Sequence, residues 1–388
     1  MLSFRLHAAA LLLLNSACTD AAAPVAGNQG EQASQEQAAQ PPLVKREGRP
    51  FTVAEVGKFG TPWAMTFLPG SGVPMTNMAL VTEKSGQLWL VDTASGQRQQ
   101  VSGVPTVKMA GQGGLGDVVA HPDFAGNRRI YLSFAEAGSG ETSGAALGYG
   151  TLETGQVAPR LTGFKVIWRQ EPKVSGNGHF SHRIAFAPDG TMFVSSGERQ
   201  KMDPAQDPNS DLGKIIHMDA EGKRLGGRYF TLGHRNVLGL AFASDGRLWE
   251  HEMGPEGGDE VNLVERGKNY GWPVVSYGSH YDGRPIPDEH KSREFEEPKV
   301  WWNASISPAG MIIYAGELFP QWKGDILMGA LSGEALIRVD VNGGNARKAD
   351  EWPMGARIRE VEQGPRGELF LLEDGPSGGR LLRLEPVR

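Results

Sequence analysis

The chain has 388 residues, and its hydrophobic fraction of 39% is enough for a sizeable core. Its 53 glycines and 25 prolines make it rich in turns, which suits one large β domain as well as two small ones. The net charge of −6, without any basic cluster, argues against a nucleic-acid partner, because phosphate binding depends on concentrated Lys and Arg.

The N-terminus has the pattern of an export signal. Arg5 precedes an apolar run over residues 6–14 that is too short to span a bilayer but long enough for a signal-peptide core. Cys18, the only cysteine, follows small residues directly after this run, as at the lipid-attachment site of a bacterial lipoprotein, although Asn15 is not the usual aliphatic residue. We predict a signal peptide over residues 1–18 with lipidation at Cys18; plain secretion is the alternative. The expected location is the periplasm or cell envelope, with membrane contact only through this anchor.

Residues 19–48 are rich in Ala, Gln, Glu and Pro and contain almost no large apolar residue. Such a segment cannot bury a core, so we predict a disordered linker. The folded domain is expected to span residues 49–388.

A loose internal repeat fills this domain. Short apolar strands flank turn residues in MTFLPGSG, VVAHPDFAGNRRIYLSF, IAFAPDGTMFVSSG, LAFASDGRLWEHE, MIIYAGELFPQWKGDILMGAL and VEQGPRGELFLLED. These are about six units, roughly 50 to 70 residues apart, within the range of propellers and other arrays. Alternating apolar residues broken by turns are typical of antiparallel hairpins. The pattern therefore predicts an all-β, six-bladed β-propeller of four-stranded antiparallel blades, with long loops that build a site at one end of the central channel.

Polar residues stand beside the strands of two repeats. His179 precedes a strand, and Glu198 ends the next strand of the same hairpin, so the carboxylate can orient the histidine as a general base. In the next repeat, Arg235 and Asn236 precede a strand and offer donors for an anion and a carbonyl group. A structural turn histidine and a solvated loop are the respective alternatives.

A third pair, Arg357 and Arg359, alternates along a strand near the C-terminus and so projects to one side. Two like charges side by side need an anion or solvent. Solvent exposure on an edge strand is the alternative.

The stretch from Trp249 to Pro273 concentrates acids, turn glycines and aromatic residues. Gly254 and Pro255 force an irregular backbone whose carbonyl groups cannot all join a sheet ladder. The surrounding carboxylates are Glu252, Glu256, Asp259 and Glu260. Carbonyl and carboxylate oxygens in one loop suit a hard cation such as calcium, although a solvated loop between two strands would show the same residues.

Five blocks in order carry a family resemblance: GQGGLGDVVAHPDF, GHFSHRIAFAPDG, TLGHRN, EMGPEGGDEVNLVERGKNYGWP and RIREVEQGPRGELFLLEDG. They resemble the soluble quinoprotein glucose/aldose sugar dehydrogenases over nearly all of residues 51–384. The resemblance implies a six-bladed propeller that binds pyrroloquinoline quinone (PQQ) and calcium. It also implies oxidation of the anomeric hydroxyl of aldose sugars to lactones, with electrons passed to an unidentified periplasmic acceptor.

The resemblance also implies residue roles. His179 matches the base, Glu198 the acid that orients it, and Arg235 the group that stabilises negative charge on the quinone oxygen. The carbonyl groups of Gly254 and Pro255 match the ligands of the calcium that polarises the quinone. The remaining matches are Gln112, Asn236, Trp302, Ser305, Arg357 and Arg359 near the cofactor, and Glu260 and the Tyr270 carbonyl at a second, structural calcium site. Asp259 lies in the same block without an assigned role.

One departure from the family pattern is Ser332, which stands where many relatives carry a lysine or arginine that pairs with a cofactor carboxylate. The absence of this cation predicts that one cofactor carboxylate is less well compensated and that the cofactor binds more weakly. Two alternatives to the dehydrogenase therefore stay open: a non-catalytic, lipid-anchored propeller that acts as a binding module, and a calcium-dependent, lactonase-like propeller. Retention of His179, Arg235 and Asn236 together favours the enzyme.

Overall fold

A computed structural model describes residues 44–46, 48–70, 77–155, 158–290 and 293–387. The predicted signal peptide, Cys18 and most of the predicted linker lie outside these residues. In the part of the chain that the structure describes, none of the helices combines the length and the apolar composition of a membrane span.

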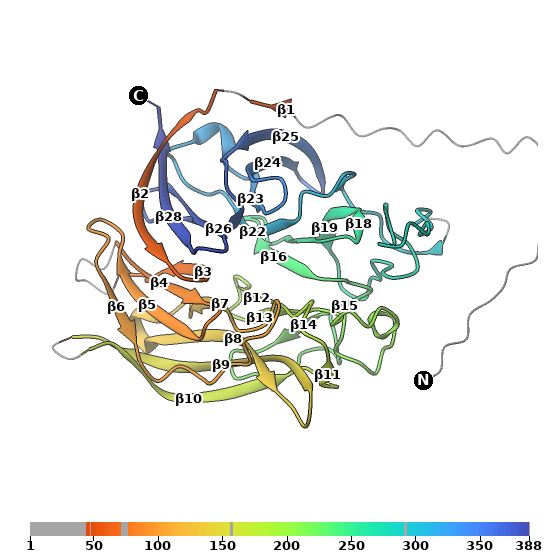
Figure 1. Cartoon of the computed structure of the whole chain (residues 1–388), viewed down its shortest axis with the longest axis horizontal. Coiled ribbons are helices and arrows are strands. Elements are labelled where there is room, and N and C mark those ends of the chain that lie inside the picture. The colour runs from red at the N-terminus through yellow and green to blue at the C-terminus, as the bar shows by residue number, and fades with distance from the viewer. Residues whose placement is uncertain (1–43, 47, 71–76, 156–157, 291–292, 388) are drawn as a thin grey trace, which may run out of the picture. The chain divides into compact units, whose positions relative to one another are not determined.

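Six antiparallel sheets follow one another around a common centre (Figure 1), which confirms the predicted six-bladed propeller. The first three blades are β3 (Pro62–Phe67), β4 (Met78–Glu83), β5 (Gln87–Asp92) and β6 (Arg98–Val101); β7 (Leu115–Ala120), β8 (Arg129–Ala137), β9 (Thr142–Glu153) and β10 (Arg160–Arg169); and β12 (Ser181–Phe186), β13 (Met192–Ser196), β14 (Lys214–Met218) and β15 (Thr231–Leu232). The short strand β11 (Val174–Ser175) adds to β9.

The other three blades are β16 (Val237–Phe242), β17 (Leu248–Glu252), β19 (Asp259–Val264) and β21 (Val300–Trp302); β22 (Pro308–Ile313), β23 (Ile326–Ala330), β24 (Ala335–Asn342) and β25 (Asn345–Pro353); and β26 (Ile358–Gln363), β27 (Leu369–Glu373), β28 (Gly379–Pro386) and β2 (Phe51–Phe59). A small hairpin of β18 (Glu256–Gly257) and β20 (Gly278–Ser279) stands beside the fourth blade. Helical segments in the described ranges include α1 (Phe124–Asn127), η1 (Asp203–Ala205) and η3 (Pro320–Trp322).

The ring closes between the two ends of the described chain. The outer strand of the last blade is β2, which pairs antiparallel with β28 and so joins a strand from the start of the domain to its last strand. In addition, β1 (Val44–Lys45) pairs in parallel with β25, and Arg46 Nε lies 2.6 Å from an oxygen of Asp350. The chain therefore joins the propeller earlier than the boundary predicted at residue 49.

Both faces of each central strand are buried, because every blade lies between two others. In β4, the side chain of Leu80 packs with Leu115 and Leu132 of the second blade. Its neighbours Ala79 and Val81 belong to a different cluster, which contains Phe370 and Leu372 of the last blade. Successive side chains of a strand point to opposite faces of its sheet. A central strand of a blade that packs against another blade on each face must therefore be apolar at every position.

The first strands of the blades are β3, β7, β12, β16, β22 and β26. Each contacts the first strand of the next blade, and β26 contacts β3. Each also has a register shift against its partner close to its own first residue, which is the mark of a β-bulge. Since these strands run antiparallel to the second strands, the segment that enters a first strand meets the residue that leaves a second strand. The polar motifs of all six blades are thereby brought to one end of the channel.

Candidate active site

Two cavities lie at this end of the channel. The larger, of about 300 Å³, is lined by Trp63, Lys84, Gln112, Phe180, Ser181, His182, Asn236, Leu238, Met253, Ser307, Leu331, Arg357, Arg359 and Asp374. The smaller, of about 180 Å³, is lined by His179, Glu198, Gln200, Met202, Arg235, Pro255, Trp272, His280 and Tyr281. Neighbouring residues of the same two segments, 179–182 and 235–236, contribute to both cavities, so the predicted residues of separate blades meet in one region.

His179 and Glu198 form a buried pair, as the hairpin predicts. The Nδ1 atom of His179 is hydrogen-bonded to the Glu198 carboxylate, which also accepts hydrogen bonds from the backbone N–H groups of Lys201 and Met202. The backbone N–H of His179 donates to the side-chain oxygen of Gln112 at 2.7 Å. Gln112 therefore holds the histidine segment in place in addition to lining the larger cavity.

The electrostatics of this pair favour a neutral histidine beside an ionised acid. Burial lowers the pKa of His179, against the opposing effect of its hydrogen bond with Glu198. Burial alone would raise the pKa of Glu198, but the hydrogen bond from His179 and the backbone N–H groups outweigh it and leave this pKa below its usual range. With Nδ1–H directed at the carboxylate, Nε2 carries the lone pair that can accept a proton.

The backbone around the pair is held in an unusual conformation. His179, Ser181 and His182 have φ angles of 49°, 63° and 79°, in the left-handed region that favours glycine. Of the ten described non-glycine residues with positive φ, three more line the two cavities: Gln200, Met202 and Ser307. Backbone strain of this kind persists where surrounding contacts enforce it, and it concentrates at functional sites.

Arg235 and Asn236 are fixed by a carboxylate that sequence reasoning had not placed there. One oxygen of Glu252 accepts hydrogen bonds from the backbone N–H groups of both residues. The Arg235 guanidinium donates to the Met253 carbonyl at 3.0 Å and to the Tyr281 hydroxyl at 3.1 Å, while its buried Nε has no partner among the described residues. The segment therefore presents a cation whose hydrogen-bonding capacity is only partly used.

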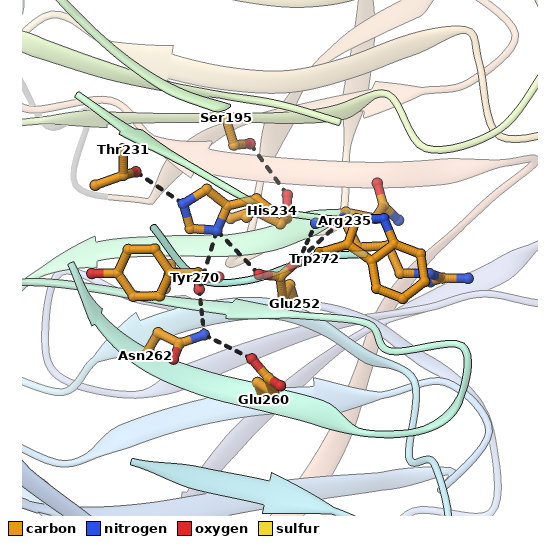
Figure 2. Close-up of polar contacts among 12 residues, drawn as sticks. Ser195, Thr231, His234, Arg235, Glu252, Glu260, Asn262, Tyr270 and Trp272 are labelled. Atoms are coloured by element: carbon orange, nitrogen blue, oxygen red, sulfur yellow. Dashed lines mark hydrogen bonds and ion pairs between the residues drawn. The ribbon is translucent and has the colours of Figure 1, made fainter. Parts of the chain in front are cut away.

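Behind this segment lies a buried cluster of acids (Figure 2). His234 Nδ1 lies 3.1 Å from Glu252, and its Nε2 lies 2.9 Å from the Thr231 hydroxyl. The amide of Asn262 donates to Glu250 at 2.7 Å and to Glu260 at 3.3 Å. Burial and the nearby Glu252 charge raise the pKa values of Glu250 and Glu260 well above their usual range. Ligand atoms of His234, Glu250 and Glu252 lie within 4.8 Å of one another, close enough to share an ion.

Asp259 acquires a role from the structure. One of its oxygens accepts the backbone N–H of Gly254 at 2.9 Å. The other accepts the Ser305 hydroxyl at 2.6 Å and the backbone N–H groups of Ile306 and Ser307 at 2.7 and 2.8 Å. A fully buried carboxylate with four donors thus ties the Gly254 turn to the segment that enters β22.

The Gly254 turn fits the predicted cation. A Cβ atom at Gly254 would lie 2.2 Å from the carbonyl oxygen of Gly257 and 2.4 Å from that of Gly258, so only glycine fits. Within the described part of the chain, neither the Gly254 nor the Pro255 carbonyl accepts a hydrogen bond. These two oxygens remain available to a hard cation.

Glu260 and Tyr270, predicted to hold a second calcium, line one narrow cleft of about 10 Å³ together with Glu252 and Ser276. The Tyr270 hydroxyl takes no part, because it donates to the Leu263 carbonyl. The structure thus brings the two predicted residues together, in a space of about one water molecule.

The part of the larger cavity that is formed by the first and last blades is cationic. Arg357 and Arg359 both donate to Asp374, and Arg359 is partly buried with a buried, unpartnered Nε. Lys84 lines the same cavity, and sequence reasoning missed both Lys84 and Asp374. The aligned repeats carry the signal for them, since each directly follows the second strand of its blade, just as Met253 does.

Two predicted cofactor contacts lie elsewhere. Trp302 and Ser305 line neither cavity. Trp302 ends β21, the outermost strand of its blade, and its ring packs in the core with Val300 and Ile326. The Ser305 hydroxyl is directed to Asp259, and Ser307 takes the place on the cavity wall. Ser332 is exposed and donates to the Ser305 carbonyl and the Ser307 hydroxyl.

Comparison with known proteins finds similarity to sugar dehydrogenases in both sequence and structure. The sequence profile of the glucose/sorbosone dehydrogenase family matches residues 59–383. The aldose sugar dehydrogenase YliI of Escherichia coli is 37% identical over 345 residues, covering 85% of this chain and 91% of that protein. A crystal structure of a glucose dehydrogenase is 40% identical with a TM-score of 0.80, covering 86% of this chain and 99% of that chain. The PQQ-bound aldose sugar dehydrogenase of Streptomyces coelicolor is 26% identical with a TM-score of 0.70, over 86% of this chain and 98% of that chain.

Proposed function

The chain belongs to the glucose/sorbosone dehydrogenase family, and we propose that it is a PQQ-dependent dehydrogenase that oxidises the anomeric hydroxyl of aldose sugars to lactones. The observation that carries the proposal is the buried His179–Glu198 pair, which faces the same small cavity as the Arg235 guanidinium. A base and a cation beside one space are what removal of a hydroxyl proton and stabilisation of a developing negative charge require.

The larger cavity fits a flat, anionic quinone. Its volume of about 300 Å³ is within the range of small-molecule sites, and Trp63, Phe180 and Leu238 supply aromatic and apolar walls. PQQ carries several carboxylates, which suit the cations Lys84, Arg357 and Arg359 on the cavity wall. The buried, unpartnered Nε atom of Arg359 on this cavity supports the fit, since buried donors normally have an acceptor.

When bound, the quinone supplies the acceptor for a hydride from the sugar carbon. The residues of this chain do the rest. Nε2 of His179 takes the hydroxyl proton, and the ionised Glu198 stabilises the imidazolium that results. Arg235 donates to the oxygen on which negative charge develops. Met253 and Tyr281 hold the guanidinium, so it needs no reorganisation during the reaction.

Calcium is part of the proposal. The carbonyl groups of Gly254 and Pro255 would hold it, and the ion would act there as a Lewis acid. Asp259 supports this arrangement from behind, because it fixes Gly254 through the backbone N–H without using the carbonyl oxygen. Glu260 and the Tyr270 carbonyl remain the proposed ligands of a second, structural ion.

We also propose that the protein acts in the periplasm or cell envelope, on the basis of residues 1–18, which lie outside the described residues. A periplasmic electron acceptor would then receive the electrons. Neither alternative function is favoured by an observation. The binding-module alternative depended on a missing cation at Ser332, yet three cations line the cavity.

The test is reconstitution. Apoprotein prepared with a chelator is titrated with PQQ in calcium chloride and followed by absorbance; dye reduction is then measured with aldoses. We expect saturable binding and sugar-dependent turnover. His179→Ala should bind PQQ normally but lose about 10²- to 10⁴-fold in kcat. The matched control is His121→Ala, at the turn between β7 and β8 on the opposite end of the channel, which should retain full activity. Absence of binding by the wild-type protein, or full turnover by His179→Ala, would contradict the proposal.

A further inference from the structure

The cationic end of the larger cavity has an unbalanced charge. Three cationic side chains line it, those of Lys84, Arg357 and Arg359. The single acid on the lining is Asp374, which lies 3.4 Å from Arg357 and closer to Arg359. Two positive charges are therefore left without a counterion among the lining residues.

Partial burial of the three cations makes this excess unfavourable unless an anion is bound. Arg359 is partly buried, and its Nε atom is buried and has no partner in the described part of the chain. Burial, followed by the charge of Arg359, lowers the pKa of Lys84. Like charges repel one another in a partly buried cavity, so a cluster of cations there indicates a binding site for an anionic ligand. The charge balance fits a group with about two negative charges, such as two carboxylates.

The Lys84 side chain is well placed to act in this site. Its backbone is anchored on both sides, by a hydrogen bond to the Thr61 carbonyl at 2.9 Å and one from Leu115 at 3.2 Å. A Cβ atom at Gly114 would lie only 2.2 Å from the Lys84 carbonyl oxygen, so this approach requires glycine. The ammonium group donates to the Gly111 carbonyl at 2.9 Å and has further donors free for a ligand.

We infer that Lys84 is a cofactor-binding residue that holds a PQQ carboxylate jointly with Arg357 and Arg359. The inference rests on the proposed function, since it takes PQQ as the ligand. It also changes the expectation for Ser332. That side chain is exposed and bonded to Ser305 and Ser307, so the third cation of the cavity comes from the first blade instead of the fifth.

The first experiment measures PQQ affinity directly, by absorbance titration of calcium-loaded apoprotein. Lys84→Gln should weaken the Kd by about 10-fold or more, and Lys84→Arg should stay close to wild type. Raising the salt concentration should weaken wild type more than Lys84→Gln. The matched control is Lys108→Gln, because Lys108 also donates to backbone carbonyl groups but lines neither cavity. It should bind PQQ like wild type.

A second measurement needs no variant. Wild-type protein is acetylated with a lysine-selective reagent in the presence and absence of PQQ, and modification is read by peptide mass spectrometry. Lys84 should be protected by PQQ, whereas Lys108 should be modified equally in both samples. Wild-type binding of PQQ with neither protection of Lys84 nor weaker binding by Lys84→Gln would overturn the inference and leave the proposed function standing. Failure of wild type to bind PQQ would overturn both.

Discussion

Replacing Glu252 with glutamine tests how the Arg235–Asn236 segment is positioned. In the native protein, one carboxylate oxygen accepts the backbone N–H groups of both residues, and the other lies 3.1 Å from His234 Nδ1. The amide keeps the shape but loses the charge that strengthens these hydrogen bonds. Glu252 is an indirect, positioning residue in this scheme, because Arg235 is the group that faces the small cavity.

A hydrogen bond to a charged group contributes about 1.5–3 kcal/mol, and the substitution removes this charge assistance while one oxygen remains as acceptor. If the loss falls on the position of Arg235 during the reaction, kcat/KM should fall roughly 10- to 150-fold. Dye-coupled turnover across aldose concentrations measures this quantity. A PQQ titration and a thermal melt on the same sample separate it from lost cofactor binding and from lost stability. We expect the PQQ Kd to change less than kcat/KM.

Glu250→Gln is the matched control. Glu250 lies in the same buried cluster, but its hydrogen-bond donor is Asn262 and it does not touch Arg235 or Asn236. Burial raises the pKa of Glu250, and glutamine keeps the shape of the uncharged acid. This variant should keep kcat/KM within about twofold. The reasoning is refuted if Glu250→Gln loses as much as Glu252→Gln, or if Glu252→Gln melts early yet keeps full kcat/KM.

Three further outcomes are expected. Asp259→Asn should lower the free energy of unfolding by about 1.5–3 kcal/mol, since four donors share this buried carboxylate, and should weaken calcium binding in calorimetry; unchanged affinity would separate Asp259 from the Gly254 turn. Burial raises the pKa of Glu360 from 4.5 to about 7, so its stabilising contribution is complete below pH 4.5 and is lost as the pH rises through 7. Urea unfolding should therefore show a stability loss between pH 5 and 8 that Glu360→Gln reduces by up to about 3 kcal/mol, and an equal pH slope in both proteins would exclude this group. Removal of calcium with a chelator should lower the Tm and the PQQ affinity together, and added calcium should restore both; a Tm insensitive to calcium would argue against bound ions.

The sequence alone was enough for the architecture and for the contacts inside one hairpin. Six apolar repeats, each broken by turn residues, predict six blades, because a strand buried between two sheets must be apolar on both faces. His179 and Glu198 flank one hairpin, β12 and β13, in which Ser181 pairs with Ser196. Antiparallel pairing of neighbouring strands brings such ends together whatever the rest of the chain does. This is why the pair was predictable.

The larger cavity, in contrast, was decided by the tertiary structure. Lys84 follows β4 in the first blade and Arg359 lies on β26 in the last, and they line one cavity only because β2 pairs with β28 and closes the ring. The position of Trp302 also depends on the tertiary structure, because Trp302 lies on the outermost strand of its blade and therefore away from the channel. Distance from the axis depends on the order of strands in each sheet and on ring closure. Neither is a property of a short stretch of sequence.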